Sequence, residues 1–278
     1  MEDAATSPDT IRVYWMTGCS SCLRTKEFLQ KNGVPFLSRN VLEDETAFQE
    51  LERFGLKQVP IVTRGDAWAN GQVLRDVAQL CRIAYGEVRM LSVAEMRERL
   101  DIVLAGAARF LAQMPDEALA QMLPNRPRTF AQLGWHIANI ADAFLEHENG
   151  IPLTFDSYMR VPAPDESGRG QLVAYNETMR RRMSEWFDGP GQTCDWSRRA
   201  DVYYGEQTMH EFLERTVWHA GQHVRQVMWV LEGIGVTPNR PLGPEVFAGL
   251  PMPEKVWDEA DPSSVRRCLL YTSPSPRD

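Results

Sequence analysis

The sequence predicts two domains of different fold class, a small α/β domain followed by an all-α domain. Up to residue 86, short β-favouring runs alternate with segments of helical apolar spacing, which is the order expected of a small sheet covered by helices. Beyond residue 86, the apolar spacing is that of long helices. At 278 residues, the chain is long enough for two ordinary domains.

The composition restricts the partners that the protein can have. With 43% hydrophobic and 24% charged residues the chain has an ordinary globular composition, and its net charge of -8 leaves it without the basic face that nucleic acid or an anionic membrane surface needs. No apolar run approaches the roughly 20 residues that cross a bilayer. The opening MEDAATSPDT carries no basic or apolar signal segment, so a cytoplasmic location, where thiols are normally reduced, is expected.

The first domain is expected to contain four strands and three helices. Asn32-Gly33, Gly55 and Gly86 mark the expected ends of its helices. In order along the chain, the expected elements are a strand over 11–16, a helix over 20–31, a strand over 34–41, a helix over 44–55, a strand over 59–65, a strand and turn over 67–71 and a helix over 72–86.

Two cysteines in TGCSSCL, Cys19 and Cys22, stand between the first strand and the first helix. A zinc site usually needs a second close pair of ligands, whereas Cys81 and Cys194 are single and far apart, so a redox pair is favoured over zinc. Backbone N–H groups at a helix start favour the thiolate, which is the attacking species in disulfide exchange. Arg24 and Lys26 are expected to add positive potential nearby, and Cys81 is expected to be a small buried side chain.

The run VYWMTGCSSCLRTKEFLQKNGVPF, followed by QVPIV, resembles the glutaredoxin family within the thioredoxin-like fold, over roughly residues 11–85. The resemblance implies that Cys19 attacks a disulfide and that Cys22 resolves the mixed disulfide. It also implies a cis-proline at Pro60, with the Val59 backbone presented to an extended thiol peptide such as glutathione.

The start of the last helix departs from the family pattern. Many glutaredoxins have Gly-Gly followed by an acid there, used to grip glutathione, whereas this chain has NGQV over residues 70–73. Gly71 fits the pattern and the acid is missing. Glutathione, another small thiol and a reductase protein therefore all remain open as the reductant.

The second domain is expected to be a four-helix bundle with a long crossover between its second and third helices. Two of its helices open with capping boxes, Thr129 with Gln132 and Thr208 with Glu211. The expected helices span residues 92–114, 129–150, 167–189 and 208–235, and the crossover contains IPLTFDSYMRVPAPD.

All five histidines fall in this second domain, and helix geometry sorts them. His219 and His223 are four apart and project from one helix face, while His136 lies on an apolar stripe that points it into the bundle. His210 is about half a turn out of phase with His219, and His147 lies about 16 Å along the helix from His136. The geometry therefore selects His136, His219 and His223.

Three inward histidines can form a hydrogen-bonded polar layer or can hold a metal ion, and three convergent imidazoles favour the metal. The segments LGWHIANI and VWHAGQHVRQ resemble the DinB-like metal-binding bundles, over roughly residues 91–235. The resemblance implies that three histidines bind one divalent ion and leave positions open for water or a thiol. Zinc, nickel, iron and manganese all remain open.

The expected domain boundaries follow from these patterns. They are a disordered N-terminus over 1–10, the glutaredoxin-like domain over 11–86, a linker over 87–91, the DinB-like bundle over 92–235, an extension over 236–267 and a tail over 268–278. The tail, CLLYTSPSPRD, resembles the conceptual translation of a transposon adapter used in sequencing libraries, so it is excluded from the fold. The natural end of the chain beyond Arg267 is therefore undefined.

The leading functional prediction is a thiol–disulfide oxidoreductase fused to a divalent-metal-binding bundle, both acting on a shared small thiol or its adduct. The alternative is a redox sensor that binds a metal or an electrophile without sustained turnover. In a third reading, the bundle is a scaffold for a homodimer and holds no metal. The expected partners are a small thiol or disulfide substrate, and no nucleic acid or membrane.

Overall fold

The computed structural model describes residues 9–86 and 89–258 and divides them into two compact units. The first unit holds the chain up to Arg89 together with Pro253–Asp258, and the second holds Met90–Met252. The expectations for residues 1–8, for 87–88 within the linker, for 259–267 of the extension and for the adapter-like tail lie outside the described residues.

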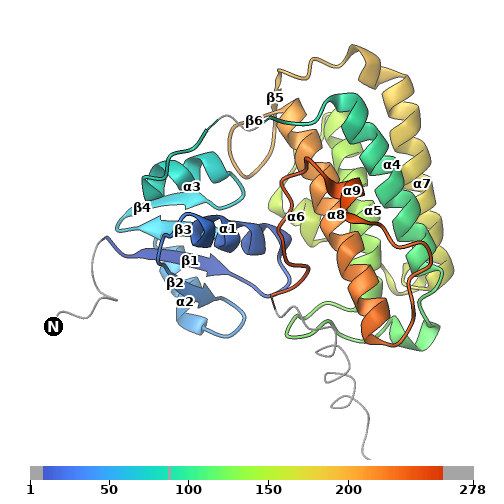
Figure 1. Ribbon diagram of the computed structural model, residues 1–278, viewed down its shortest axis with the longest axis horizontal. Coiled ribbons are helices and arrows are strands. Elements are labelled where there is room, and N and C mark those ends of the chain that lie inside the picture. Colours follow the sequence, from blue (N-terminus) through green and yellow to red (C-terminus); the bar gives the residue numbers. More distant parts are fainter. Residues whose placement is uncertain (1–8, 87–88, 259–278) are drawn as a thin grey trace, which may run out of the picture. The chain divides into compact units, whose positions relative to one another are not determined.

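The first unit contains a four-stranded sheet in the order β2-β1-β3-β4, with three helices (Figure 1). β1 pairs with β2 in parallel and with β3 antiparallel, and β3 pairs antiparallel with β4. The bounds are β1 Ile11–Trp15, α1 Ser20–Lys31, β2 Leu37–Asn40, α2 Glu45–Glu52, β3 Ile61–Arg64, β4 Ala67–Asn70 and α3 Leu74–Cys81. The predicted α/β thioredoxin-like fold class is confirmed. The fourth strand, expected over 67–71, is formed as β4.

Successive strand residues face opposite sides of the sheet, and each side builds its own apolar core. Val13 and its partner Val62 pack in a cluster with residues from α1 and α3. Their neighbours Tyr14 and Ile61 pack in a second cluster, which includes buried residues of α2. The sheet is therefore covered on both sides, and the start of α1 lies directly after β1.

The prediction that the helix after β4 runs to Gly86 is wrong, because α3 ends at Cys81. Arg82 adopts a left-handed conformation with φ of 57°, and its N–H bonds to carbonyls of the last helical turn. Ile83 then packs against the apolar cluster and donates its N–H to Ala78. Apolar residues after the turn thus prolong the helical pattern without belonging to the helix.

Helices dominate the second unit, as predicted, and four of those in its described residues are long. They are α4 Val93–Leu111, α5 Phe130–Glu148, α7 Arg169–Asp188 and α8 Met209–Gly233. Both α4 and α5 pack against α7 and α8. The buried faces of all four are mainly apolar, and α5, α7 and α8 also bury polar side chains. The short elements are α6 Phe155–Met159, α9 Pro244–Phe247, a two-residue ladder of β5 Arg199–Ala200 and β6 Gln207–Thr208, and the 3₁₀ helices Asp116–Ala118, Pro164–Glu166 and Pro190–Thr193.

The starts of the long helices follow the capping signals in the sequence. The predicted capping boxes of Thr129 with Gln132 and of Thr208 with Glu211 are both formed, and Ser92 with Glu95 forms another at the start of α4. Each box satisfies N–H groups that the first helical turn cannot bond internally.

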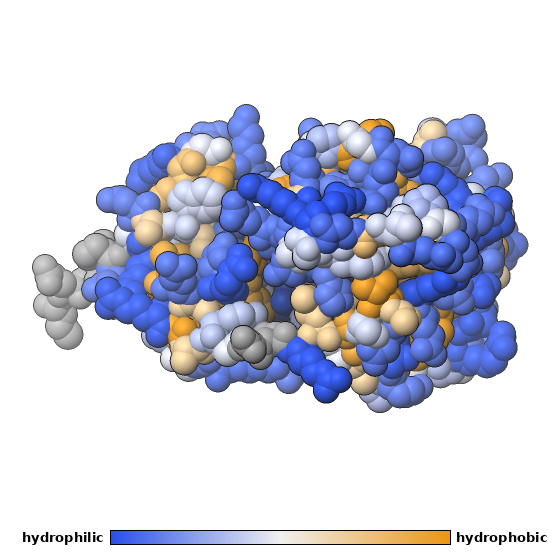
Figure 2. All heavy atoms as spheres, turned by 90° about the horizontal axis from the view of Figure 1, so that it is seen from above, coloured by the Kyte–Doolittle hydropathy of each residue, from blue (hydrophilic) through white to orange (hydrophobic). Residues whose placement is uncertain are grey.

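Part of the predicted C-terminal extension over 236–267 belongs to the first unit. Pro253–Asp258 pack there, while the residues before them belong to the second unit. The face of the molecule seen in Figure 2 is mainly hydrophilic, with apolar residues in small scattered groups. In the described part of the chain, each helix is too short or too polar to cross a membrane.

Candidate functional site

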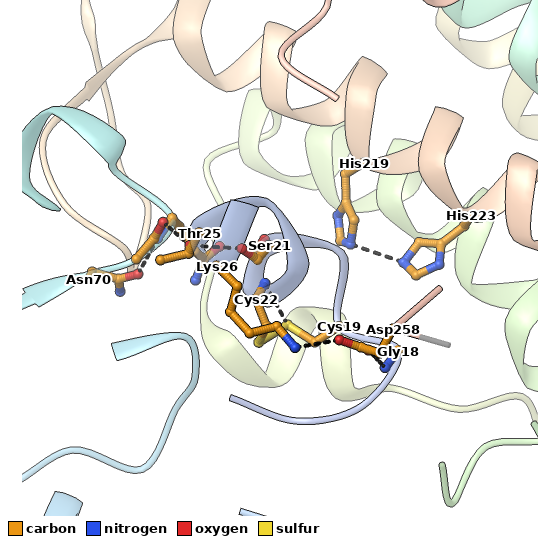
Figure 3. Close-up of a disulfide and its surroundings, with 12 residues drawn as sticks. Gly18, Cys19, Ser21, Cys22, Thr25, Lys26, Asn70, His219, His223 and Asp258 are labelled. Carbon is orange, nitrogen blue, oxygen red and sulfur yellow. Dashed lines mark hydrogen bonds and ion pairs between the residues drawn. A yellow bond between two sulfur atoms is a disulfide. The ribbon is translucent and has the colours of Figure 1, made fainter. Parts of the chain in front are cut away.

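The structure places the cysteine pair at the start of α1, where Cys19 is the N-cap residue (Figure 3). Its sulfur accepts a hydrogen bond from the Cys22 N–H at 3.2 Å, and the two cysteines are joined as a disulfide with Cα atoms 5.2 Å apart. Cys19 is partly exposed, whereas Cys22 is fully buried. Cys19 is therefore the more accessible residue of the pair.

Pro60 and Gly71 lie together beside α1. The Val59–Pro60 peptide bond is cis, and the Gly71 N–H donates to the Pro60 carbonyl at 2.9 Å. The Thr25 hydroxyl of α1 contacts the Gly71 carbonyl oxygen at 2.7 Å. A Cβ atom at Gly71 would come within 2.9 Å of Pro60 and of the Thr25 hydroxyl, so glycine is required here by close approach.

The cations expected near the cysteine pair both have partners in the first unit. Arg24 donates from Nη1 to the Gln72 carbonyl at 3.4 Å. Lys26 pairs with Asp258 at 2.5 Å and lies over the Trp15 ring, 3.1 Å from its centroid. Burial lowers the pKa of Lys26, and the Asp258 carboxylate opposes that effect. Sequence reasoning missed Asp258 because no local pattern links residues so far apart along the chain.

His136 of α5 converges with His219 and His223 of α8 in the second unit. One ring nitrogen from each lies within 4.8 Å of those of the other two, and all three side chains are buried. The Nε2 atoms of His219 and His223 are 3.1 Å apart, as Figure 3 marks with a dashed line. The structure thus brings together the three histidines that helix geometry selected.

Two of these rings belong to a chain of hydrogen bonds. Arg215 Nη1 lies 3.4 Å from His219 Nδ1, and His223 Nδ1 lies 2.6 Å from Gln226 Oε1. Since a guanidinium only donates and an amide oxygen only accepts, one set of tautomers satisfies the whole chain when His219 carries its proton on Nε2. An ion bound at that Nε2 atom would take the place of the hydrogen bond between the two imidazoles. His136 stands outside this chain of hydrogen bonds, and its buried Nδ1 has no hydrogen-bond partner among the described residues.

The surroundings of the three imidazoles favour their neutral form. Burial lowers the pKa of His136 and His219 well below the usual value for histidine, and it lowers the pKa of His223 to about 3. The positive charges of Arg128 and Arg215 act in the same direction. Neutral imidazole is the form that ligates a metal ion.

Aromatic rings surround Arg215 next to the histidines. Its guanidinium carbon lies 4.5 Å from the Tyr204 ring centroid, 5.1 Å from that of Tyr158 and 5.9 Å from that of Trp218. The Tyr158 ring also stands edge-on to His136 and His219. Sequence reasoning missed Arg215 and Tyr158, although Arg215 is four residues before His219 and so shares its helix face.

The remaining two histidines lie elsewhere in the second unit. His147 Nε2 accepts the Asp201 N–H at 3.0 Å, and its Nδ1 lies 3.1 Å from Glu148. His210 Nε2 lies 2.8 Å from the Leu91 carbonyl oxygen. Both rings therefore make hydrogen bonds with other residues of the second unit.

The three histidines fit a divalent cation on two observations. Two imidazole nitrogens bound at about 2.0–2.1 Å and roughly 90–110° apart would be about 2.8–3.4 Å from each other. The His219 and His223 Nε2 atoms satisfy this spacing, and the Nδ1 atom of His136 is a buried donor or acceptor that no described residue satisfies. A ligating histidine usually donates the N–H of its other ring nitrogen to an acceptor that fixes the ring. Gln226 would be that acceptor for His223.

Together, fold and geometry define a thioredoxin-like unit with a cysteine pair and a helical unit with a histidine cluster. Residues 11–68 match the family model of glutaredoxin, and residues 99–227 match that of the DinB superfamily. The chain therefore joins a glutaredoxin domain to a DinB superfamily domain, as the resemblances implied.

The other comparisons add no argument about function. No curated protein matches the chain. Among solved structures, the apo form of human glutathione-S-transferase T1-1 is similar over 94% of this chain and 97% of its own, with 12% identity and a TM-score of 0.33. A TM-score this low supports no conclusion about the arrangement of the chain.

Proposed function

We propose that the protein is a cytoplasmic thiol–disulfide oxidoreductase whose glutaredoxin domain is joined to a domain that binds one divalent metal ion. The observation that carries the redox half is the position of Cys19 at the N-cap of α1, partly exposed, with buried Cys22 three residues later. Backbone N–H groups at a helix start stabilise a thiolate, which makes Cys19 the nucleophile.

The proposed reaction proceeds by two exchanges. The Cys19 thiolate attacks one sulfur of a disulfide RS–SR′, so that a Cys19–SR mixed disulfide forms and R′S⁻ leaves and takes a proton. The Cys22 sulfur then attacks Cys19 Sγ after losing its proton, forming the Cys19–Cys22 disulfide and releasing the second thiol. Two molecules of a reducing thiol, for which we propose glutathione, return both cysteines to the reduced state and become a disulfide. Val59, Pro60 and Gly71, beside α1, are proposed to bind that thiol.

Turnover of a small disulfide tests this half. With glutathione, glutathione reductase and NADPH present, bis(2-hydroxyethyl) disulfide should be reduced through many cycles, and Cys19→Ser should lower the rate by about 100-fold or more because the nucleophile is lost. Cys81→Ser is the matched control, because Cys81 lies at the end of α3 and is expected to leave the rate unchanged. A single reaction without turnover would instead support the redox sensor.

The metal half of the proposal is carried by the convergence of His136, His219 and His223 within 4.8 Å. A divalent ion, when bound, would lower the pKa of a thiol or water that coordinates it. The protein residues would supply three neutral donors, exclude bulk water through their burial and hold the His223 ring through Gln226. Elemental analysis of the purified protein should find one zinc, nickel, iron or manganese ion per chain.

A shared small thiol is proposed to connect the two domains. The support is the fusion itself, since one chain would carry a thiol-exchange site and a site suited to a thiol or its adduct. Turnover of glutathione adducts should then depend both on the metal and on Cys19. The connection is rejected if chelation of the metal and Cys19→Ser each leave the turnover of such adducts unchanged.

A further inference from the structure

Two segments from opposite ends of the sequence meet beside the cysteine pair in the first unit. We call Pro253–Asp258 the C-terminal strap. The Asp258 carboxylate accepts the Gly18 N–H at 2.9 Å and pairs with Lys26 Nζ at 2.5 Å, as Figure 3 shows. Gly18 directly precedes Cys19, and Lys26 lies seven residues after it on the same face of α1.

Several further contacts hold the strap on α1. The Glu27 carboxylate accepts the backbone N–H of Glu254 at 2.7 Å and that of Lys255 at 3.0 Å. The Trp257 ring, only 1% exposed, packs on Gly18, where any Cβ atom would clash with it. Gly18 also has a φ of 70°, which a glycine adopts without strain. Backbone hydrogen bonds, an ion pair and the packing of the Trp257 ring therefore together hold the strap in place.

The strap changes the electrostatics of the redox helix. In the sequence, Lys26 is a cation that favours the Cys19 thiolate, but in the folded protein a carboxylate neutralises it. The charged groups around Lys26 are Glu27 of α1 and Lys255 and Asp258 of the strap. The Asp258 carboxylate also accepts the N–H of Gly18, the residue directly before Cys19.

We propose that the strap is a redox-sensitive restraint on Cys19, an inference that rests on the proposed role of the cysteine pair. In the disulfide form Cys19 carries no charge, and Asp258 binds the Gly18 N–H and Lys26 without competition. A dithiol reductant adds two electrons and two protons to give two thiols and is itself oxidised to a disulfide. When Cys19 then loses its proton, the thiolate repels the Asp258 carboxylate and competes for the same donors, so the strap loosens.

The coupling works in both directions, because two sites that affect each other's free energy do so reciprocally. If the thiolate weakens the strap, the docked strap must raise the pKa of the Cys19 thiol and restrain its reactivity. Release of the strap would then yield the more reactive enzyme.

The first test measures alkylation of Cys19 in the reduced full chain by iodoacetamide, between pH 4 and 10, with the modified peptide quantified by mass spectrometry. Asp258→Asn should lower the thiol pKa and raise the alkylation rate at pH 6 by about tenfold, the size expected when a nearby like charge is removed. Glu254→Gln is the comparison within the strap, since its carboxylate pairs with exposed Lys31 and not with Gly18 or Lys26, and it should shift the profile much less than Asp258→Asn does. An Asp258→Asn profile that coincides with the wild-type profile overturns the proposal.

The second test measures amide hydrogen exchange of the strap and of Gly18 at pH 8 with and without dithiothreitol. Reduction should speed exchange at Glu254 and Lys255 about fivefold or more in the wild type, because their bonds to Glu27 open as the strap loosens. In Cys19→Ser, which forms no thiolate there, dithiothreitol should cause no change. Equal exchange in both states of the wild type rejects the strap mechanism, whereas failed disulfide turnover with these responses intact rejects only the proposed catalysis.

Discussion

The two candidate sites differ in how the chain assembles them. Cys19 and Cys22 lie three residues apart, and the start of a single helix orients both. The histidine cluster instead needs α5 to pack against α8, because His136 is on one helix and His219 and His223 are on the other. A site built within one helix depends on local structure, whereas a site built between helices depends on the whole apolar core of its unit.

The largest expected effect is the loss of metal binding in a variant that still reduces disulfides. His219→Ala should lower metal affinity by at least about 100-fold, since a lost ligand should cost no less than a lost partner of a ligand. Metal content measured on the dialysed protein should fall to near zero, while reduction of a small disulfide continues. His210→Ala, on the same helix but bonded to the Leu91 carbonyl, should keep its metal. Retention of one ion per chain in His219→Ala would contradict the three-histidine site.

A smaller loss of metal affinity is expected when Gln226, which contacts one histidine of the cluster, is changed. Gln226→Leu removes the acceptor of His223 Nδ1, so the ring loses its fixed orientation and metal affinity should fall by about 10–100-fold. Competition with a chelator of known affinity measures this change. Thr216→Val is the matched control on α8, because the buried Thr216 hydroxyl donates to the Phe212 carbonyl of its own helix. Equal affinities in the two variants would show that Gln226 does not position the ligand.

A long-range ion pair at the end of α5 should make the second unit sensitive to acid. Burial of Glu148 is outweighed by hydrogen bonds from His147 and Arg198, which lower the pKa of Glu148 in the folded state. Its stabilising contribution is therefore full above the unfolded pKa, near 4.5, and is lost as pH falls below that value.

The comparison variant for this pair is Glu148→Gln. Below pH 4.5, its free energy of unfolding should fall less steeply than that of the wild type, by up to about 1.4 kcal/mol per pH unit. Urea unfolding followed by circular dichroism measures the slopes. Glu206→Gln breaks only the exposed pair with Arg199 and should change the free energy of unfolding little. Parallel slopes for wild type and Glu148→Gln would count against the ion pair.

The smallest expected effect concerns the N-cap of α5, a local feature of the second unit. Thr129→Ala removes the N-cap of α5 and should lower the free energy of unfolding by about 1 kcal/mol. Thr129→Ser keeps the hydroxyl and should be close to neutral. Chemical denaturation of both variants gives the comparison, and a loss of equal size in both would mean that the methyl group, and not the cap, is responsible.

Local patterns in the sequence were sufficient for most of the fold. The helix start at Ser20, the capping boxes at Thr129 and Thr208 and the alternation of strands and helices in the first unit are all formed. These features depend on residues within a few positions of one another, so their physical causes are visible along the chain. The end of α3 at Cys81 was misjudged because an apolar side chain after a left-handed residue follows the same pattern as a continuing helix.

The sequence by itself determined the two domains, the cysteine pair at a helix start and the trio of histidines that one face of each helix presents. Only the tertiary structure decided how close those histidines come, that Arg215 and Tyr158 lie beside them, and that Asp258 neutralises Lys26. The reason is that helix and strand signals act over a few residues, whereas a partner more than two hundred positions away is chosen by the packing of the whole unit.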